Sequence, residues 1–199
     1  MEGKGAKAAS VTALARCTIR AAAMQERRPE VVLSMLNEAL LRQQAGRFCT
    51  LVFSRVRVDK TGVVSVSISS GGHPMPITVT PNGLGPGTGE SGDLLGVFEH
   101  PELRESTVSI SPGDALVFFT DGITEARRGK DFFGEDRLKA WLDEHCREDA
   151  HELANGLVED VLTFQEGNPR DDIAVVVIGN PLRAQNESAK LANGSDFWR

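Results

Sequence analysis

The segment Ala115-Leu-Val-Phe-Phe-Thr-Asp-Gly-Ile-Thr-Glu-Ala126 joins an apolar run to a group of acidic residues. The run from 115 to 120 is rich in β-forming residues and almost wholly apolar, which is typical of a strand covered on both faces. Asp121 follows directly, and Gly122 permits a sharp turn of the backbone beside it. The segment therefore predicts a buried strand with a carboxylate at its end.

A second segment, Arg170-Asp-Asp-Ile-Ala-Val175, has the reverse order. Asp171 and Asp172 stand immediately before an apolar run over 173–178, which predicts a strand central to its sheet. Carboxylates held at strand ends suit hard divalent cations, which prefer several oxygen ligands. Asp-Gly and Asp-Asp are also ordinary turn and cap residues beside strands. The residues alone leave a metal site and simple turn chemistry both open.

The rest of the chain predicts two helix pairs around two groups of strands. Apolar residues at helical spacing indicate helices over 6–24 and 29–46, and two more with apolar faces from Leu138 to Cys146 and from Leu153 to Leu162. Between the pairs, Val64-Ser-Val-Ser-Ile68 alternates as in a sheet with one buried face. The predicted strands are 48–58, 64–68, 77–80, 105–110, 115–120 and 173–178.

Composition narrows the class of protein. The 199 residues carry a formal net charge of −6, which argues against a nucleic-acid partner. No stretch reaches the roughly 18 apolar residues of a membrane span, and the N-terminus lacks the apolar core of a signal peptide. We therefore expect a cytoplasmic protein with no membrane partner and with three buried thiols, Cys17, Cys49 and Cys146. We expect one domain over 1–179 and a disordered tail over 180–199.

Two other phosphate chemistries do not fit these residues. A haloacid-dehalogenase enzyme needs an Asp nucleophile two residues before a second Asp, and that position is Phe119. Gly3-Lys4-Gly5 lacks the longer glycine-bounded loop and the Ser or Thr after the Lys that a P-loop requires.

Six landmarks in order along the chain resemble the SpoIIE-like, PPM-type serine/threonine phosphatases, and the match runs from about Gly3 to Gly179. The landmarks are Gly3-Lys4-Gly5-Ala6 with Ala8-Ala9, Arg47-Phe-Cys-Thr50, Ser70-Gly-Gly-His-Pro74, Leu95-Gly96-Val97, Pro112 to Ala126, and Arg170 to Val175.

The resemblance implies an α+β fold, the PPM-type four-layer α-β-β-α sandwich of two mostly antiparallel sheets. It also implies two Mn²⁺ or Mg²⁺ ions whose water hydrolyses phosphoserine or phosphothreonine directly, with no catalytic side chain beyond that water. By position, Asp121 and Asp171 match metal ligands, and Asp172, Glu125 and Gly122 are their neighbours, of which the two carboxylates are expected to orient bound waters. The implied substrate is a small regulatory phosphoprotein, such as a STAS-type anti-sigma-factor antagonist.

The chain departs from the family pattern at its start. Gly3, Lys4 and Gly5 are the remnant of the first motif, whose bridging Asp falls just before Met1. The first strands are missing with it, so we expect an N-terminally incomplete domain whose full site needs that Asp. The alternative function is a catalytically impaired pseudophosphatase that acts as a protein-binding regulatory module.

Overall fold

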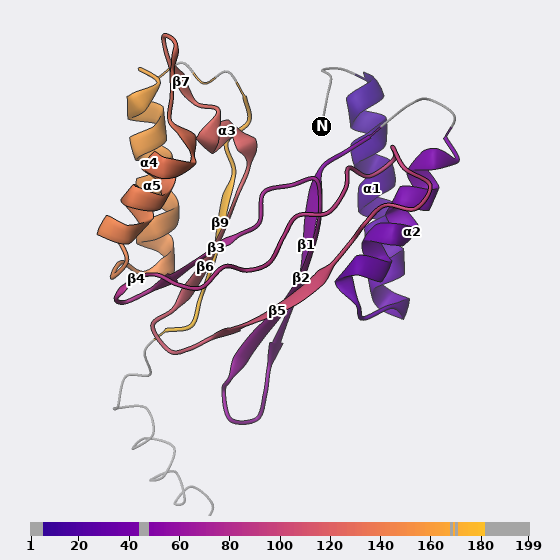
Figure 1. Cartoon of the computed structure of the whole chain (residues 1–199), viewed down its shortest axis with the longest axis horizontal. Helices are drawn as coiled ribbons and strands as arrows, with labels where there is room; N and C mark the ends of the chain where they lie inside the picture. The colour runs from indigo at the N-terminus through magenta and orange to yellow at the C-terminus, as the bar shows by residue number, and fades with distance from the viewer. Residues whose placement is uncertain (1–5, 44–47, 168, 170, 182–199) are drawn as a thin grey trace, which may run out of the picture.

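Two sheets lie face to face between two helix pairs in the computed structural model (Figure 1), which describes residues 6–43, 48–167, 169 and 171–181. The helices are α1 (Ala6–Gln25), α2 (Pro29–Leu41), α3 (Asp121–Thr124), α4 (Gly134–Glu144) and α5 (Ala150–Phe164). The strands are β1 (Leu51–Val58), β2 (Val64–Gly71), β3 (Ile77–Thr80), β4 (Gly83–Leu84), β5 (Glu105–Ile110), β6 (Ala115–Phe119), β7 (Arg127–Arg128), β8 (Asp131–Phe132) and β9 (Val175–Gly179).

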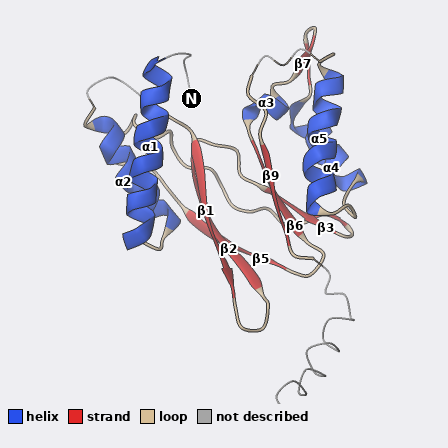
Figure 2. Ribbon diagram, turned by 180° about the vertical axis from the view of Figure 1, so that it is seen from behind, coloured by secondary structure: helices blue, strands red, loops and turns tan. Residues whose placement is uncertain are grey.

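The layers follow the order helix pair, sheet, sheet, helix pair. One sheet has the strand order β1-β2-β5 and is covered by α1 and α2; the other has the order β4-β3-β6-β9 and is covered by α4 and α5 (Figure 2). All strand pairs within these sheets are antiparallel. The α+β four-layer sandwich predicted from the sequence is confirmed.

Strand β6 is apolar on both faces because it lies between two layers. Val117 and Phe119 pack with α4 and α5, whereas Leu116 and Phe118 pack between the two sheets. Successive side chains of a strand point to opposite faces, so a strand in this position has no solvent-facing side. This packing fixes the strand whose end carries Asp121.

The predicted central place of the last strand is wrong. Within the described part of the chain, β9 pairs with β6 alone and so lies at an edge of its sheet. Val175 and Val177 pack toward the helices and Ile178 between the sheets, while Val176 is 59% exposed. Apolar side chains on both faces of a strand indicate that other layers pack above and below it. They do not indicate whether strands are hydrogen-bonded on both of its edges.

The thiols also differ from the prediction. Cys49 is buried and Cys146 is half-buried, but Cys17 is exposed. The buried face of α1 carries Val11 and Ala15, and helical spacing turns residue 17 away from that face. None of the helices in the described ranges is long and apolar enough to cross a membrane.

Two carboxyl groups meet where the helix layer contacts the sheet. Glu105 begins β5, and the hydrogen bond to the Glu30 carboxyl, together with burial and repulsion from Glu30, raises the pKa of Glu105 to about 7. Ser67 and Arg28 act in the opposite direction. The Oε2 atom of Glu30 is buried without a hydrogen-bond partner. Protonation of Glu105 therefore relieves its repulsion from Glu30.

We expect the free energy of unfolding to fall as the pH rises from the ordinary glutamate pKa through about 7. A carboxyl whose pKa is raised by folding stabilises the folded state while protonated, and this stability is lost when the group ionises. The loss should be on the order of 1 kcal/mol, because solvent screens a largely exposed carboxylate. Urea unfolding at several pH values measures it.

Glu105→Gln should remove most of this pH dependence, whereas Glu159→Gln on the exposed face of α5 should keep it. A Glu105→Gln protein with the wild-type slope would contradict the assignment.

Candidate metal centre

A hydrogen-bonded clamp joins the end of β6 to the start of β9. The last ladder pair is Phe119 with Val175, and the Thr120 backbone N–H extends the ladder by donating to the Ala174 carbonyl at 3.1 Å. The Thr120 hydroxyl donates to the Asp172 carbonyl at 2.9 Å and accepts from the Ala174 N–H at 3.0 Å. Thr120, which directly precedes Asp121, therefore holds the segment after Asp171 next to the end of β6.

Gly122 allows the two acidic segments to lie in direct contact. A Cβ atom at position 122 would stand 2.4 Å from the Asp172 carbonyl oxygen, closer than real Cβ atoms come to a neighbour. The residue is buried in the first turn of α3, which lies beside β9 at one end of the sheet (Figure 1). Glycine is thus required here for close approach of two backbones.

The predicted ligands stand on these joined segments. Asp121 is the first residue of α3 and Glu125 follows its last, while Asp171 and Asp172 precede β9. All four are exposed, and in the described part of the chain none of them forms an ion pair. One Asp171 oxygen accepts a hydrogen bond from the Asp172 N–H at 2.8 Å.

The oxygen chemistry of these side chains fits a hard divalent cation, and their exposure leaves them accessible to one. Among the described residues, however, no three or more His, Cys, Asp or Glu side chains are gathered into a group that could hold a metal. The residues therefore fit a divalent cation in the placement of their backbone and in the type of donor atom. The assignment of Asp121 and Asp171 as ligands stays a prediction. Gly3, Lys4 and Gly5 lie outside the described residues.

His73 is a neighbour of the site that the sequence did not single out as functional. Its Nε2 donates to the Phe119 carbonyl at 3.1 Å, directly before Thr120. Burial lowers its pKa below the ordinary histidine value, against the opposing effects of the Phe119 carbonyl and the Asp121 charge. The imidazole is thus mainly neutral at neutral pH. The Ser70-Gly-Gly-His-Pro74 landmark was the available signal, but nothing local links it to Asp121.

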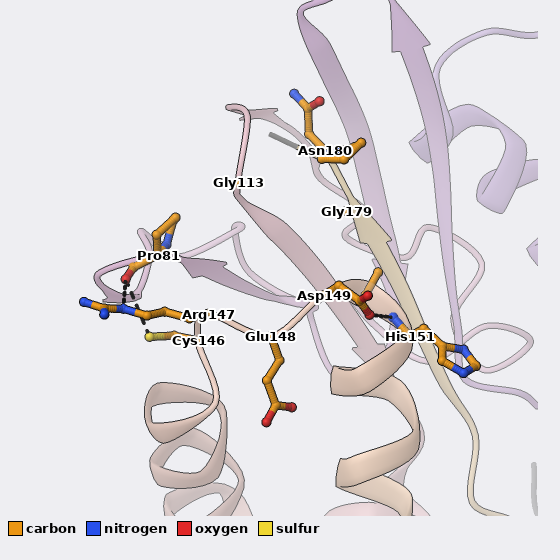
Figure 3. Close-up of a pocket in the computed structure, with 11 residues that line it drawn as sticks. Pro81, Gly113, Cys146, Arg147, Glu148, Asp149, His151, Gly179 and Asn180 are labelled. Atoms are coloured by element: carbon orange, nitrogen blue, oxygen red, sulfur yellow. Dashed lines mark hydrogen bonds between the residues drawn. The ribbon is translucent and has the colours of Figure 1, made fainter. Parts of the chain in front are cut away.

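A cavity of about 660 Å³ lies elsewhere and is separate from this site. It is lined around Gly179, at the end of β9 remote from Val175, and Arg147 and Cys146 reach the Pro81 carbonyl at its wall (Figure 3). The acidic strand ends therefore do not line it.

A four-layer sandwich with carboxylates on adjoining strand ends is the arrangement of a PP2C-type, or PPM-class, serine/threonine phosphatase domain. The chain belongs to the SpoIIE family (Stage II sporulation protein E), whose model matches residues 1–180. Metal dependence is general to this class of phosphatases.

Comparison with individual proteins agrees with this assignment. The phosphoserine phosphatase RsbU of Bacillus subtilis is 24% identical over 178 residues, which are 88% of this chain and 52% of RsbU. Protein IcfG of Synechocystis is 24% identical over 133 residues, 66% of this chain and 20% of IcfG. The chain thus spans about half the length of RsbU and a fifth of IcfG.

Solved structures share the fold at low identity. The RsbU and RsbW domains of Rv1364c from Mycobacterium tuberculosis superpose with a TM-score of 0.70 at 18% identity, covering 95% of this chain and 55% of that one. The SiaA-PP2C domain of Pseudomonas aeruginosa gives 0.63 at 20% identity, covering 89% and 71%.

Gly122→Ala should force the Asp121 and Asp172 segments apart and destabilise the protein by about 1–3 kcal/mol, the usual cost of an added methyl in a packed place. Gly87→Ala is the matched control, because a Cβ there meets nothing within 4 Å. Thermal unfolding measures both effects. Equal stability of the two variants would show that the segments are not in contact.

Proposed function

We propose that this chain is a metal-dependent phosphatase domain that hydrolyses phosphoserine or phosphothreonine on a small regulatory phosphoprotein of the anti-sigma-factor antagonist type, in the cytoplasm. The observation that carries the proposal is the Thr120 clamp, which joins the two acidic segments within a SpoIIE-family fold. The similarity to RsbU, a phosphoserine phosphatase by its description, supports the class of substrate.

In this proposal Asp121 and Asp171 hold Mn²⁺ or Mg²⁺. Such an ion, when bound, supplies an acidified water as the nucleophile near neutral pH. The chain contributes carboxylates on rigid strand ends, so that little ordering remains to be done on binding. Asp172 and Glu125 stand where they can orient waters, and a neutral His73 anchors the end of β6 without adding a positive charge that would repel a cation.

A second ion needs more negative charge than these residues provide. Two divalent cations held close together repel strongly, and a carboxylate that bridges them contributes charge and geometry to both. We therefore propose that the full pair forms when an N-terminal extension brings the Gly-Asp element of the family motif.

The second candidate function is a regulatory module that binds a phosphoprotein without hydrolysing it. It is favoured by the absence, in the described ranges, of a gathered group of three or more metal-ligating side chains. Both functions predict binding of a phosphoprotein, but only the phosphatase predicts its hydrolysis. Assays of binding and of turnover on the same protein therefore separate them.

Asp121→Asn and Asp171→Asn should each abolish most Mn²⁺-dependent turnover of a phosphoserine peptide, measured on the chain extended through the Gly-Asp element. A loss of about 4 kcal/mol in transition-state stabilisation corresponds to roughly a thousandfold in rate. Asp160→Asn, on an exposed part of α5, is the charge-matched control and should keep full activity.

Wild-type turnover in either variant would contradict the ligand assignment. No turnover in the extended wild type, together with binding of the phosphorylated partner, would support the regulatory module instead.

A further inference from the structure

The outer face of the β1-β2-β5 sheet changes from apolar to cationic along β1. Leu51 and Phe53 pack beneath the helix pair. Arg55 and Arg57 continue the same face, because alternate residues of a strand point to one side. The β1–β2 hairpin extends past the turn between α1 and α2 (Figure 1), so this part of the face is not covered by a helix.

A cavity of about 590 Å³ lies on this uncovered face. Its polar walls are Arg27 from the α1–α2 turn, Arg55 and Arg57 from β1, Ser65 and Ser67 from β2, and Thr107 from β5; we call these six residues the basic groove. The strand register explains the grouping, since Ser67 lies opposite both Arg55 and Thr107, and Ser65 lies opposite Arg57. Directly paired residues of antiparallel strands share a face.

Arg55 is held in a fixed orientation by two hydrogen bonds, and its Nε donor remains unpaired. Its Nη2 donates to the carbonyls of Ala23 and Glu26, the latter at 2.5 Å, at the C-terminal end of α1. Its Nε is buried and has no hydrogen-bond partner. A buried donor on a charged group that stays unpaired is costly, so Arg55 keeps hydrogen-bonding capacity that its α1 partners do not use.

The charge of the groove is only partly offset from within the described chain. There, no carboxylate forms an ion pair with Arg27, Arg55 or Arg57. The backbone N–H groups of Arg28 and Arg27 lower the pKa of Glu26, and the Arg55 charge adds to this effect. The neighbouring Glu26 carboxylate is turned to the backbone, where it accepts from the N–H groups of Arg27 at 2.6 Å and Arg28 at 2.9 Å. Three guanidinium groups thus gather on a protein whose net charge is −6.

Two further carboxyls lie nearby: Glu105, which hydrogen-bonds Ser67 at the margin of the groove, and Glu30, which hydrogen-bonds Glu105. The pKa of Glu105 is raised to about 7 by the hydrogen bond to Glu30, so much of Glu105 is uncharged near neutral pH. Glu105 therefore repels an incoming anion less than an ordinary glutamate would.

We propose that the basic groove binds the phosphate group of a phosphorylated serine or threonine on a protein partner. Guanidinium forks match phosphate oxygens in pairs, and the serine and threonine hydroxyls add neutral donors. The volume of about 590 Å³ exceeds what a free phosphate ion needs and leaves room for the residue that carries it.

The groove is a docking site and not a second view of the metal centre. It lies at the α1–α2 turn, whereas α3, which begins with Asp121, lies at the opposite end of the molecule in both Figure 1 and Figure 2. A phosphorylated segment bound there is held away from the acidic strand ends. The proposal therefore does not depend on whether the chain hydrolyses phosphate.

The test is an NMR titration of the full ¹⁵N-labelled chain in metal-free buffer with chelator, which removes any contribution from the metal centre. The probes are inorganic phosphate, a five-residue alanine peptide with one central phosphoserine, and the same peptide with serine or glutamate. The phosphoserine peptide should shift the Arg55 Nε signal and the amide signals of Ser65, Ser67 and Thr107.

Arg27→Gln with Arg57→Gln should weaken binding of the phosphoserine peptide by about tenfold or more. The charge-assisted hydrogen bonds to its phosphate are lost, while no contact that supports the fold is removed. Arg16→Gln with Lys130→Gln removes the same charge outside the groove and should leave the affinity within about twofold. Circular dichroism and thermal unfolding establish that both double variants fold.

Weaker binding of inorganic phosphate than of the phosphoserine peptide supports a polypeptide source. Equal binding of the glutamate and phosphoserine peptides would overturn the assignment to phosphate. Shifts confined to other residues, or unchanged affinity in the Arg27→Gln, Arg57→Gln protein, would overturn the groove itself.

Discussion

The hydroxyl of Thr120 is the contact on which the candidate site depends. It donates to the Asp172 carbonyl and accepts from the Ala174 N–H, so it joins the exit of one strand to the entry of another. Neither acidic segment is long enough to hold a position by itself, and a loop that is not tied would cost conformational entropy to order around an ion. Gly122 completes the join, since any larger residue would meet the Asp172 carbonyl.

The layers behind this contact explain why it is rigid. Phe119, the residue before Thr120, is buried against the α4–α5 layer, and His73, in the connection between β2 and β3, donates a hydrogen bond to its carbonyl. The acidic side chains themselves are exposed, and one Asp171 oxygen accepts a hydrogen bond from the Asp172 N–H. A joined backbone that carries exposed carboxylates suits a site that an ion finishes ordering. The basic groove has a similar construction, because Arg55 is fixed by the α1 carbonyls, while Arg27 and Arg57 are exposed and form no ion pair in the part of the chain that the structure describes.

Much of the fold could be predicted from local patterns. The strands over 77–80 and 105–110 match β3 and β5, and the acidic residues lie beside the ends of β6 and β9, although β9 begins at Val175 and not at the expected residue 173. Sequence patterns failed where the information is not local. The apolar run of β9 did not reveal its edge position, the exposure of Cys17 depended on which face of α1 meets α2, and His73 is linked to Phe119 only through tertiary packing. The basic groove could not be predicted from the sequence for the same reason, since strand register brings its residues together.

The central claim is that Asp121 and Asp171, joined through Thr120, bind one divalent cation together. A crystal structure of the chain grown with Mn²⁺, with anomalous diffraction to locate the metal, tests this most directly. The account predicts an anomalous peak within about 2.6 Å of a carboxylate oxygen from each of the two residues, the upper limit for oxygen ligands of hard cations. A peak bound by neither residue, or none at Mn²⁺ concentrations that support turnover in the extended chain, would contradict it.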